Sequence, residues 1–104
     1  MKTMIIALAL ISLGSPAFTA DCPAFYLSGL FYRAANVCDH SWLKRPGFLI
    51  TTSSAAQCKI PAKKAKSLLK RGENDFDIGI INRGQNAACA YVDTEMTITE
   101  NNGK

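Results

Sequence analysis

The hydrophobic positions of residues 24–38 recur with the period of an α-helix. At the helical rotation of about 100° per residue, the apolar side chains of this segment fall on one continuous arc. Such an arc is typical of a helix that packs one face against a core. The arc consists of Tyr26, Leu27, Leu30, Phe31, Ala34, Val37 and Cys38. Pro23 suits the first helical position, where the missing backbone N–H leaves no hydrogen bond unmade. The pattern therefore predicts a core-facing helix over residues 23–37.

A second helical pattern covers residues 61–71. Alanines and leucines form its apolar arc, and Gly72 is the residue type that commonly follows the end of a helix. Before this pattern, Pro46 and Gly47 indicate a turn, and the apolar run 48–50 suits the start of a strand. The hydroxyl residues 51–54 are suitable N-caps for a short helix over residues 55–58. We therefore expect a helix over residues 61–71 that Gly72 ends.

Residues 73–91 fit two periods. Phe76, Ile78 and Ile80 alternate as in a strand, whereas helical spacing accounts for more apolar residues over a longer run. We therefore expect two short helices that meet near Gly84. Residues 94–104 are polar, and we expect them to form a flexible C-terminal tail. Together the patterns predict an all-α fold, a small bundle of three to four short helices.

The first 20 residues have the features of a secretory signal peptide. Lys2 precedes an apolar run over residues 4–13, and small residues follow it. The run is too short to span a bilayer as a helix. We expect cleavage after Ala20, with Ala17 as the alternative, and a domain over residues 21–93 followed by the tail. The protein is thus predicted to be exported, periplasmic or secreted, without a transmembrane anchor.

Four cysteines, Cys22, Cys38, Cys58 and Cys89, predict two disulfides in an exported chain of this length. A helix over residues 23–37 separates Cys22 and Cys38 by roughly 24 Å. A disulfide needs Cα atoms within about 7 Å, so these two cysteines do not pair with each other. We favour Cys22–Cys58 with Cys38–Cys89 over Cys22–Cys89 with Cys38–Cys58. No close cysteine pair of the kind typical of zinc sites is present, so we expect no metal.

Positive charge is concentrated in one segment. The 12 basic and 8 acidic residues give a formal charge of +4, which falls to +3 when Lys2 is removed with the leader. Five basic residues lie opposite the apolar arc of segment 61–71: Lys63, Lys64, Lys66, Lys70 and Arg71. They form a candidate anion-binding face for a membrane surface, an acidic polymer or an acidic protein. The structural alternative is the solvated outer face of a core-packed helix.

A second candidate surface lies on the back of the first predicted helix. Phe25 and Tyr32 are seven residues apart and lie roughly opposite the core arc, with Arg33 beside them. Aromatic residues together with an arginine are typical anchors of protein–protein interfaces. The structural alternative is that a later segment, around Trp42 or Phe48, covers this side. The three residues Phe25, Tyr32 and Arg33 are our candidate partner-binding site.

The sequence contains no pattern typical of an enzyme. His40 is the single histidine and has no second ligand or triad partner at a suitable spacing. Glu73, Asp75 and Asp77 cluster where we expect a helix to start, and negative side chains are favourable there. We therefore expect no catalytic residue and no cofactor.

In size, compartment and cysteine use, the chain is similar to small periplasmic helical modules that act as acid-stress chaperones or as immunity proteins. We interpret the sequence as a small exported, non-enzymatic binding module of inhibitor, immunity or chaperone type that acts on another envelope or secreted protein. The alternative is a cationic protein that binds polyanions or membrane surfaces through residues 63–71. The sequence does not indicate an oligomeric state.

Overall fold

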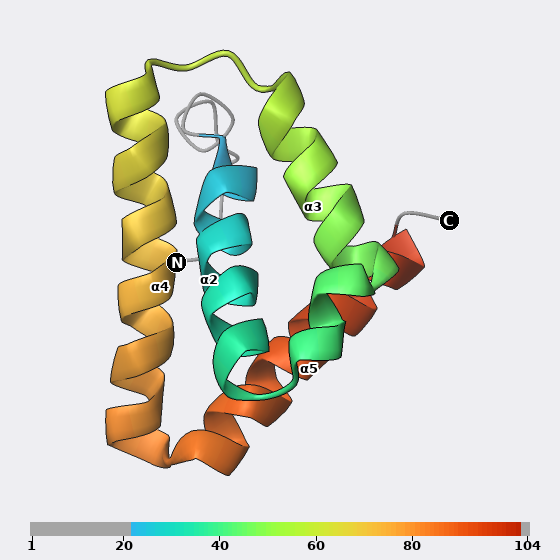
Figure 1. Cartoon of the computed structure of the whole chain (residues 1–104), viewed down its shortest axis with the longest axis vertical. Coiled ribbons are helices and arrows are strands. Elements are labelled where there is room, and N and C mark those ends of the chain that lie inside the picture. The colour runs from blue at the N-terminus through green and yellow to red at the C-terminus, as the bar shows by residue number, and fades with distance from the viewer. Residues whose placement is uncertain (1–21, 103–104) are drawn as a thin grey trace, which may run out of the picture.

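The computed structural model describes residues 22–102 of the 104-residue chain. The helices follow in the order α2 (Pro23–Val37), the 3-10 helix η1 (His40–Lys44), α3 (Pro46–Gln57), α4 (Ala62–Arg83) and α5 (Gln85–Asn102). Helix α2 lies between α4 and α3, and α5 crosses near the end of α2 (Figure 1). No strand occurs within residues 22–102, so the predicted all-α class is confirmed. The predicted signal peptide lies outside the described residues.

The core is built on one face of α2. Its buried residues come from α2, α4 and α5: Leu30, Phe31, Ala34, Phe76, Ala88, Val92 and Met96. The predicted apolar arc of α2 is confirmed, since each of its seven residues either belongs to this cluster or packs against it. Trp42 of η1 and Phe48 of α3 also pack against the cluster. Helix α2 is therefore the element around which the other helices assemble.

Two disulfides hold α2 at both ends. Cys22–Cys58 joins the start of α2 to the end of α3, with Cα atoms 6.2 Å apart. Cys38–Cys89 joins the end of α2 to α5, with Cα atoms 5.9 Å apart. These two bridges are the favoured pairing, which is therefore confirmed. A 15-residue helix lies between Cys22 and Cys38 and keeps those two cysteines apart.

Gly72 lies inside α4, so the prediction of a helix that ends at Arg71 is wrong. Helix α4 continues for 22 residues from Ala62 to Arg83. A Cβ atom on Gly72 would overlap the carbonyl oxygen of Tyr26 and lie 2.6 Å from the backbone nitrogen of Leu30. Gly72 therefore permits the close approach of α4 to α2, a role that the pattern along one helix does not reveal.

Gly29 of α2 makes the matching contact from the other helix. A Cβ atom there would overlap the carbonyl oxygen of Leu69 on α4. The two helices run in the same direction along each other (Figure 1). Backbone-to-backbone packing at Gly29 and Gly72 thus sets their separation, with no side chain between them at the crossing.

The predicted junction near Gly84 is confirmed. Gly84 separates α4 from α5 and has a φ of 90°, a backbone conformation that favours glycine. Its N–H donates to the carbonyl of Ile80, which closes the last turn of α4. The chain changes direction here and enters α5 (Figure 1).

Two other local predictions differ from the structure. Residues 48–50 belong to α3, which begins at Pro46, and the hydroxyl residues 51–54 lie within it; Thr51 donates to the carbonyl of Gly47 instead of capping a later helix. The polar segment from residue 94 is helical as far as Asn102 instead of forming a flexible tail. Met96 is fully buried and anchors this part of α5 to the core.

Arg45 provides the second anchor of α5. Its guanidinium donates to Asp93 at 2.5 Å, to both carboxylate oxygens of Glu100 at 3.1 and 3.2 Å, and to Thr97 at 3.2 Å. The backbone N–H of Gly47 also donates to Glu100, at 3.0 Å. The start of α3 therefore holds the C-terminal half of α5. Within residues 22–102, no helix has the length and hydropathy of a membrane span.

Candidate functional site

The five basic residues of the candidate anion-binding face are all exposed on the first half of α4. Because α4 begins at Ala62, the positive end of its dipole lies close to Lys63, Lys64 and Lys66 and adds to their potential. The structure thus brings these charges together with the helix terminus that best suits an anion.

The acidic residues Glu73, Asp75 and Asp77 lie in the middle of α4, so their predicted place at a helix start is wrong. Two of them bond to α2. Asp75 accepts a hydrogen bond from the hydroxyl of Tyr26 at 2.6 Å, and Asp77 accepts one from Nε of Arg33 at 2.9 Å. These two carboxylates therefore link α4 to α2 beside the contact between Gly29 and Gly72.

The outer face of α2 carries the candidate partner-binding residues. Tyr32 is 49% exposed, so no later segment covers it. Phe25 is half-buried, whereas Arg33 is exposed and held by Asp77. This bond raises the pKa of the Arg33 guanidinium, which stays charged. We call these three residues of α2 the α2 face; Phe25 and Tyr32 lie seven residues apart on one side of the helix, and Arg33 lies between them and α4.

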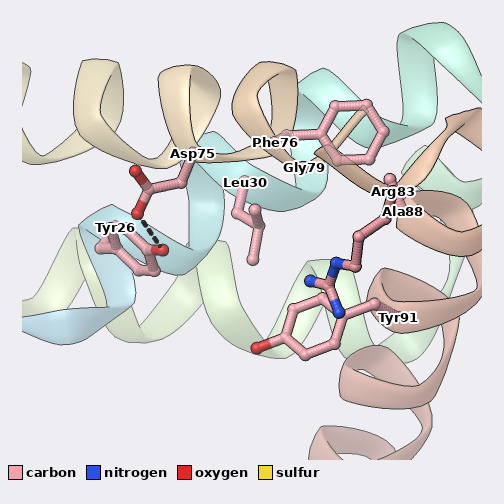
Figure 2. A pocket seen from close by; sticks show the side chains of 8 residues that line it. All are labelled: Tyr26, Leu30, Asp75, Phe76, Gly79, Arg83, Ala88 and Tyr91. Atoms are coloured by element: carbon pink, nitrogen blue, oxygen red, sulfur yellow. Dashed lines mark hydrogen bonds between the residues drawn. The ribbon is translucent and has the colours of Figure 1, made fainter. Parts of the chain in front are cut away.

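A pocket of about 210 Å³ opens between α2, α4 and α5 (Figure 2). Part of its wall is apolar and comes from Leu30, Phe76 and Ala88, while Gly79 contributes backbone. Its polar lining consists of Tyr26, Asp75, Arg83 and Tyr91. Three helices that are separate in sequence thus contribute to one cavity.

The polar residues of the pocket form two pairs. Tyr26 donates its hydroxyl to Asp75, and the guanidinium of Arg83 lies over the ring of Tyr91, 5.4 Å from its centroid. Burial raises the pKa of Tyr26, and the hydrogen bond to Asp75 raises it further. Burial and the charge of Glu95 also raise the pKa of Tyr91, although Arg83 opposes this. Both phenols are therefore neutral hydrogen-bond donors at physiological pH.

Sequence reasoning did not identify this pocket. Tyr26 was expected only in the core arc, and Arg83 and Tyr91 lie on different helices that meet because of the turn at Gly84. The available signal was the seven-residue spacing of Gly72 and Gly79, which puts both glycines on one face of α4. A glycine on a helix face leaves room for the backbone of another helix, as at Gly72, or for a cavity, as at Gly79.

The remaining candidate, His40, is exposed at the start of η1. Among residues 22–102, no group of three or more histidine, cysteine or acidic residues could hold a metal ion. Comparison with known proteins gives no family model, no curated protein and no solved structure that matches this chain.

Proposed function

We propose that this protein is an exported, non-enzymatic module that binds another envelope or secreted protein through the α2 face. The observation that carries the proposal is the half-exposed Tyr32 on a helix that is held at both ends by disulfides. Tyrosine and arginine dominate the energetics of many protein interfaces, and Tyr32 lies next to Arg33.

The rigidity of this face supports the proposal. Helix α2 is in backbone contact with α4 at Gly29, and Asp77 orients Arg33. A face that is ordered before binding loses less conformational freedom in the complex, which favours affinity. The exported location of the proposal rests on the leader sequence and on the two disulfides, which are typical of oxidising compartments.

The proposal is tested by capture of partners from envelope extract with the oxidised mature protein. We expect one stoichiometric protein that remains bound at high salt, because screening weakens exposed charge contacts more than buried aromatic ones. Tyr32→Ala should reduce its capture by about tenfold or more, as expected for an interface anchor. Ile81→Ala is the matched control, since Ile81 is 80% exposed on α4 and does not belong to the α2 face. Equal capture by both variants would contradict the proposal.

The basic half of α4 supports a second candidate function, the binding of a polyanion or an anionic membrane surface. The observation that favours it is the position of exposed Lys63 and Lys66 in the first turns of a 22-residue helix. In the same capture experiment this function predicts a heterogeneous anionic set that is lost at high salt. Lys63→Gln with Lys66→Gln should then reduce binding, whereas Tyr32→Ala should leave it unchanged.

A further inference from the structure

Arg83 differs from Arg33 and Arg45, both of which bond to carboxylates. Arg33 bonds to Asp77, and Arg45 bonds to Asp93 and Glu100. Within residues 22–102, Arg83 forms no ion pair, and its guanidinium carbon lies over the ring of Tyr91, 5.4 Å from the ring centroid. Stacking on an aromatic ring orients a guanidinium and leaves the N–H groups at its edge available. Arg83 lines the pocket, and its guanidinium can donate two parallel hydrogen bonds to a carboxylate bound there.

The other end of the pocket has the opposite chemistry. Asp75 accepts a hydrogen bond from the hydroxyl of Tyr26. Its carboxylate can accept further hydrogen bonds, because it has several lone pairs. Figure 2 shows this pair apart from Arg83 and Tyr91, with Leu30 between the two pairs. The pocket thus presents a cationic donor at one end, an apolar middle and an anionic acceptor at the other end.

The size of the pocket limits its ligand. Its volume of about 210 Å³ is below the range of about 300–1,000 Å³ that drug-sized ligands occupy. One ring with a short acidic chain fits such a space. The apolar wall of Leu30, Phe76 and Ala88 suits the ring.

We propose that this pocket binds a small aromatic carboxylic acid, with the carboxylate on Arg83, the ring over the apolar wall and a hydroxyl or amino group donating to Asp75. This ligand site is distinct from the α2 face, whose residues do not line the pocket. It therefore extends the proposed function and does not depend on it.

Gly79 provides a test that separates ligand binding from folding. A Cβ atom on Gly79 would lie 3.7 Å from the Cβ of Ala88, an ordinary van der Waals distance, so alanine fits without a backbone shift. The added methyl group would nevertheless occupy part of the pocket. Gly79→Ala should therefore keep or raise the melting temperature while it weakens ligand binding by about tenfold, the effect of one misplaced methyl group in a tight site.

The experiment is a titration of the oxidised mature protein with 4-hydroxyphenylacetate. Binding is measured by calorimetry and by the changes in NMR chemical shift of the residues around Gly79 and Tyr91. Phenylacetate lacks the distal donor, and 4-hydroxyphenylacetamide lacks the charge; both should bind more weakly. Arg83→Gln should weaken binding of the acid by about tenfold or more, and Arg83→Lys, which keeps the charge without the planar fork, by less. Lys63→Gln removes the same charge from the same helix outside the pocket and should have no effect.

Absence of binding by 4-hydroxyphenylacetate would overturn the proposal. Equal affinity for the acid and its amide, or unchanged affinity in both Arg83→Gln and Gly79→Ala, would also overturn it. Tyr32→Ala should bind the probe as the wild-type protein does. Failure of the ligand site would therefore leave the proposed function of the α2 face untouched. Failure of the α2 face to bind a protein would likewise leave the ligand site untouched.

Discussion

Two glycines of α4 should respond in opposite ways to the same methyl group. At Gly72 the added Cβ meets backbone atoms of α2, and overpacking of this kind lowers the free energy of unfolding by about 1–3 kcal/mol. At Gly79 the nearest atom beyond the helix is 3.7 Å away, and alanine is about 1 kcal/mol more favourable than glycine within a helix. In urea unfolding, Gly72→Ala should thus lower the free energy of unfolding, whereas Gly79→Ala should raise it slightly. A Gly72→Ala variant as stable as the wild-type protein would contradict the close helix contact at Gly72.

Single residues also show where sequence reasoning works and where it fails. The arc of α2 could be predicted because one helix with one buried face has a period that the chain itself displays. The role of Gly72 could not be predicted, because it depends on the backbone of a different helix. A glycine at this position is compatible with the end of a helix and with a close contact between two helices. Only the nearby backbone of Tyr26 and Leu30 shows that Gly72 has the second role.

At the scale of elements, the anchoring of α5 by Arg45 can be measured. The side chain of Arg45 is only 21% exposed, and it bonds to three side chains of α5. Arg45→Met keeps much of the apolar stem but leaves Glu100 without this donor, so we expect a loss of about 1–3 kcal/mol in the free energy of unfolding. Hydrogen exchange should also become faster in residues 94–102. Arg33→Met is the control, because its ion pair is solvent-exposed and should contribute less.

The same anchor explains why the end of α5 was not predicted. Residues 94–102 are polar and, taken alone, resemble a flexible tail. Their helix depends on Met96 in the core and on Glu100 at the start of α3, which are contacts between distant segments. By contrast, the break at Gly84 is a local property of the backbone, with a positive φ that glycine adopts easily, and it agrees with the helical pattern on both sides of this residue.

For the whole molecule, the disulfides should supply a large share of the stability. They close loops with sequence separations of 36 and 51 residues. The entropy of loop closure predicts about 4 kcal/mol for each, compared with about 5–15 kcal/mol for the total stability of a typical domain. Reduction of both bridges should therefore unfold the protein or lower its melting temperature strongly. A melting curve that is indifferent to reductant would contradict this role.

The overall architecture could be predicted because helix length and cysteine position constrain each other. A helix over residues 23–37 excludes one disulfide pairing, and the remaining helical patterns give the all-α class. The pocket could not be predicted in this way. It requires the relative placement of α2, α4 and α5, which depends on the glycine crossing and on the turn at Gly84.

The most direct test of the α2 face is site-specific photo-cross-linking in the cell that makes the protein. A photoreactive phenylalanine replaces Tyr32 in one variant, Ile81 in a second and Lys63 in a third. The proposed function predicts one discrete protein adduct from position 32 and none from position 81, although Ile81 is the more exposed of the two. Adducts from position 63 alone, or the same pattern from positions 32 and 81, would contradict binding through the α2 face.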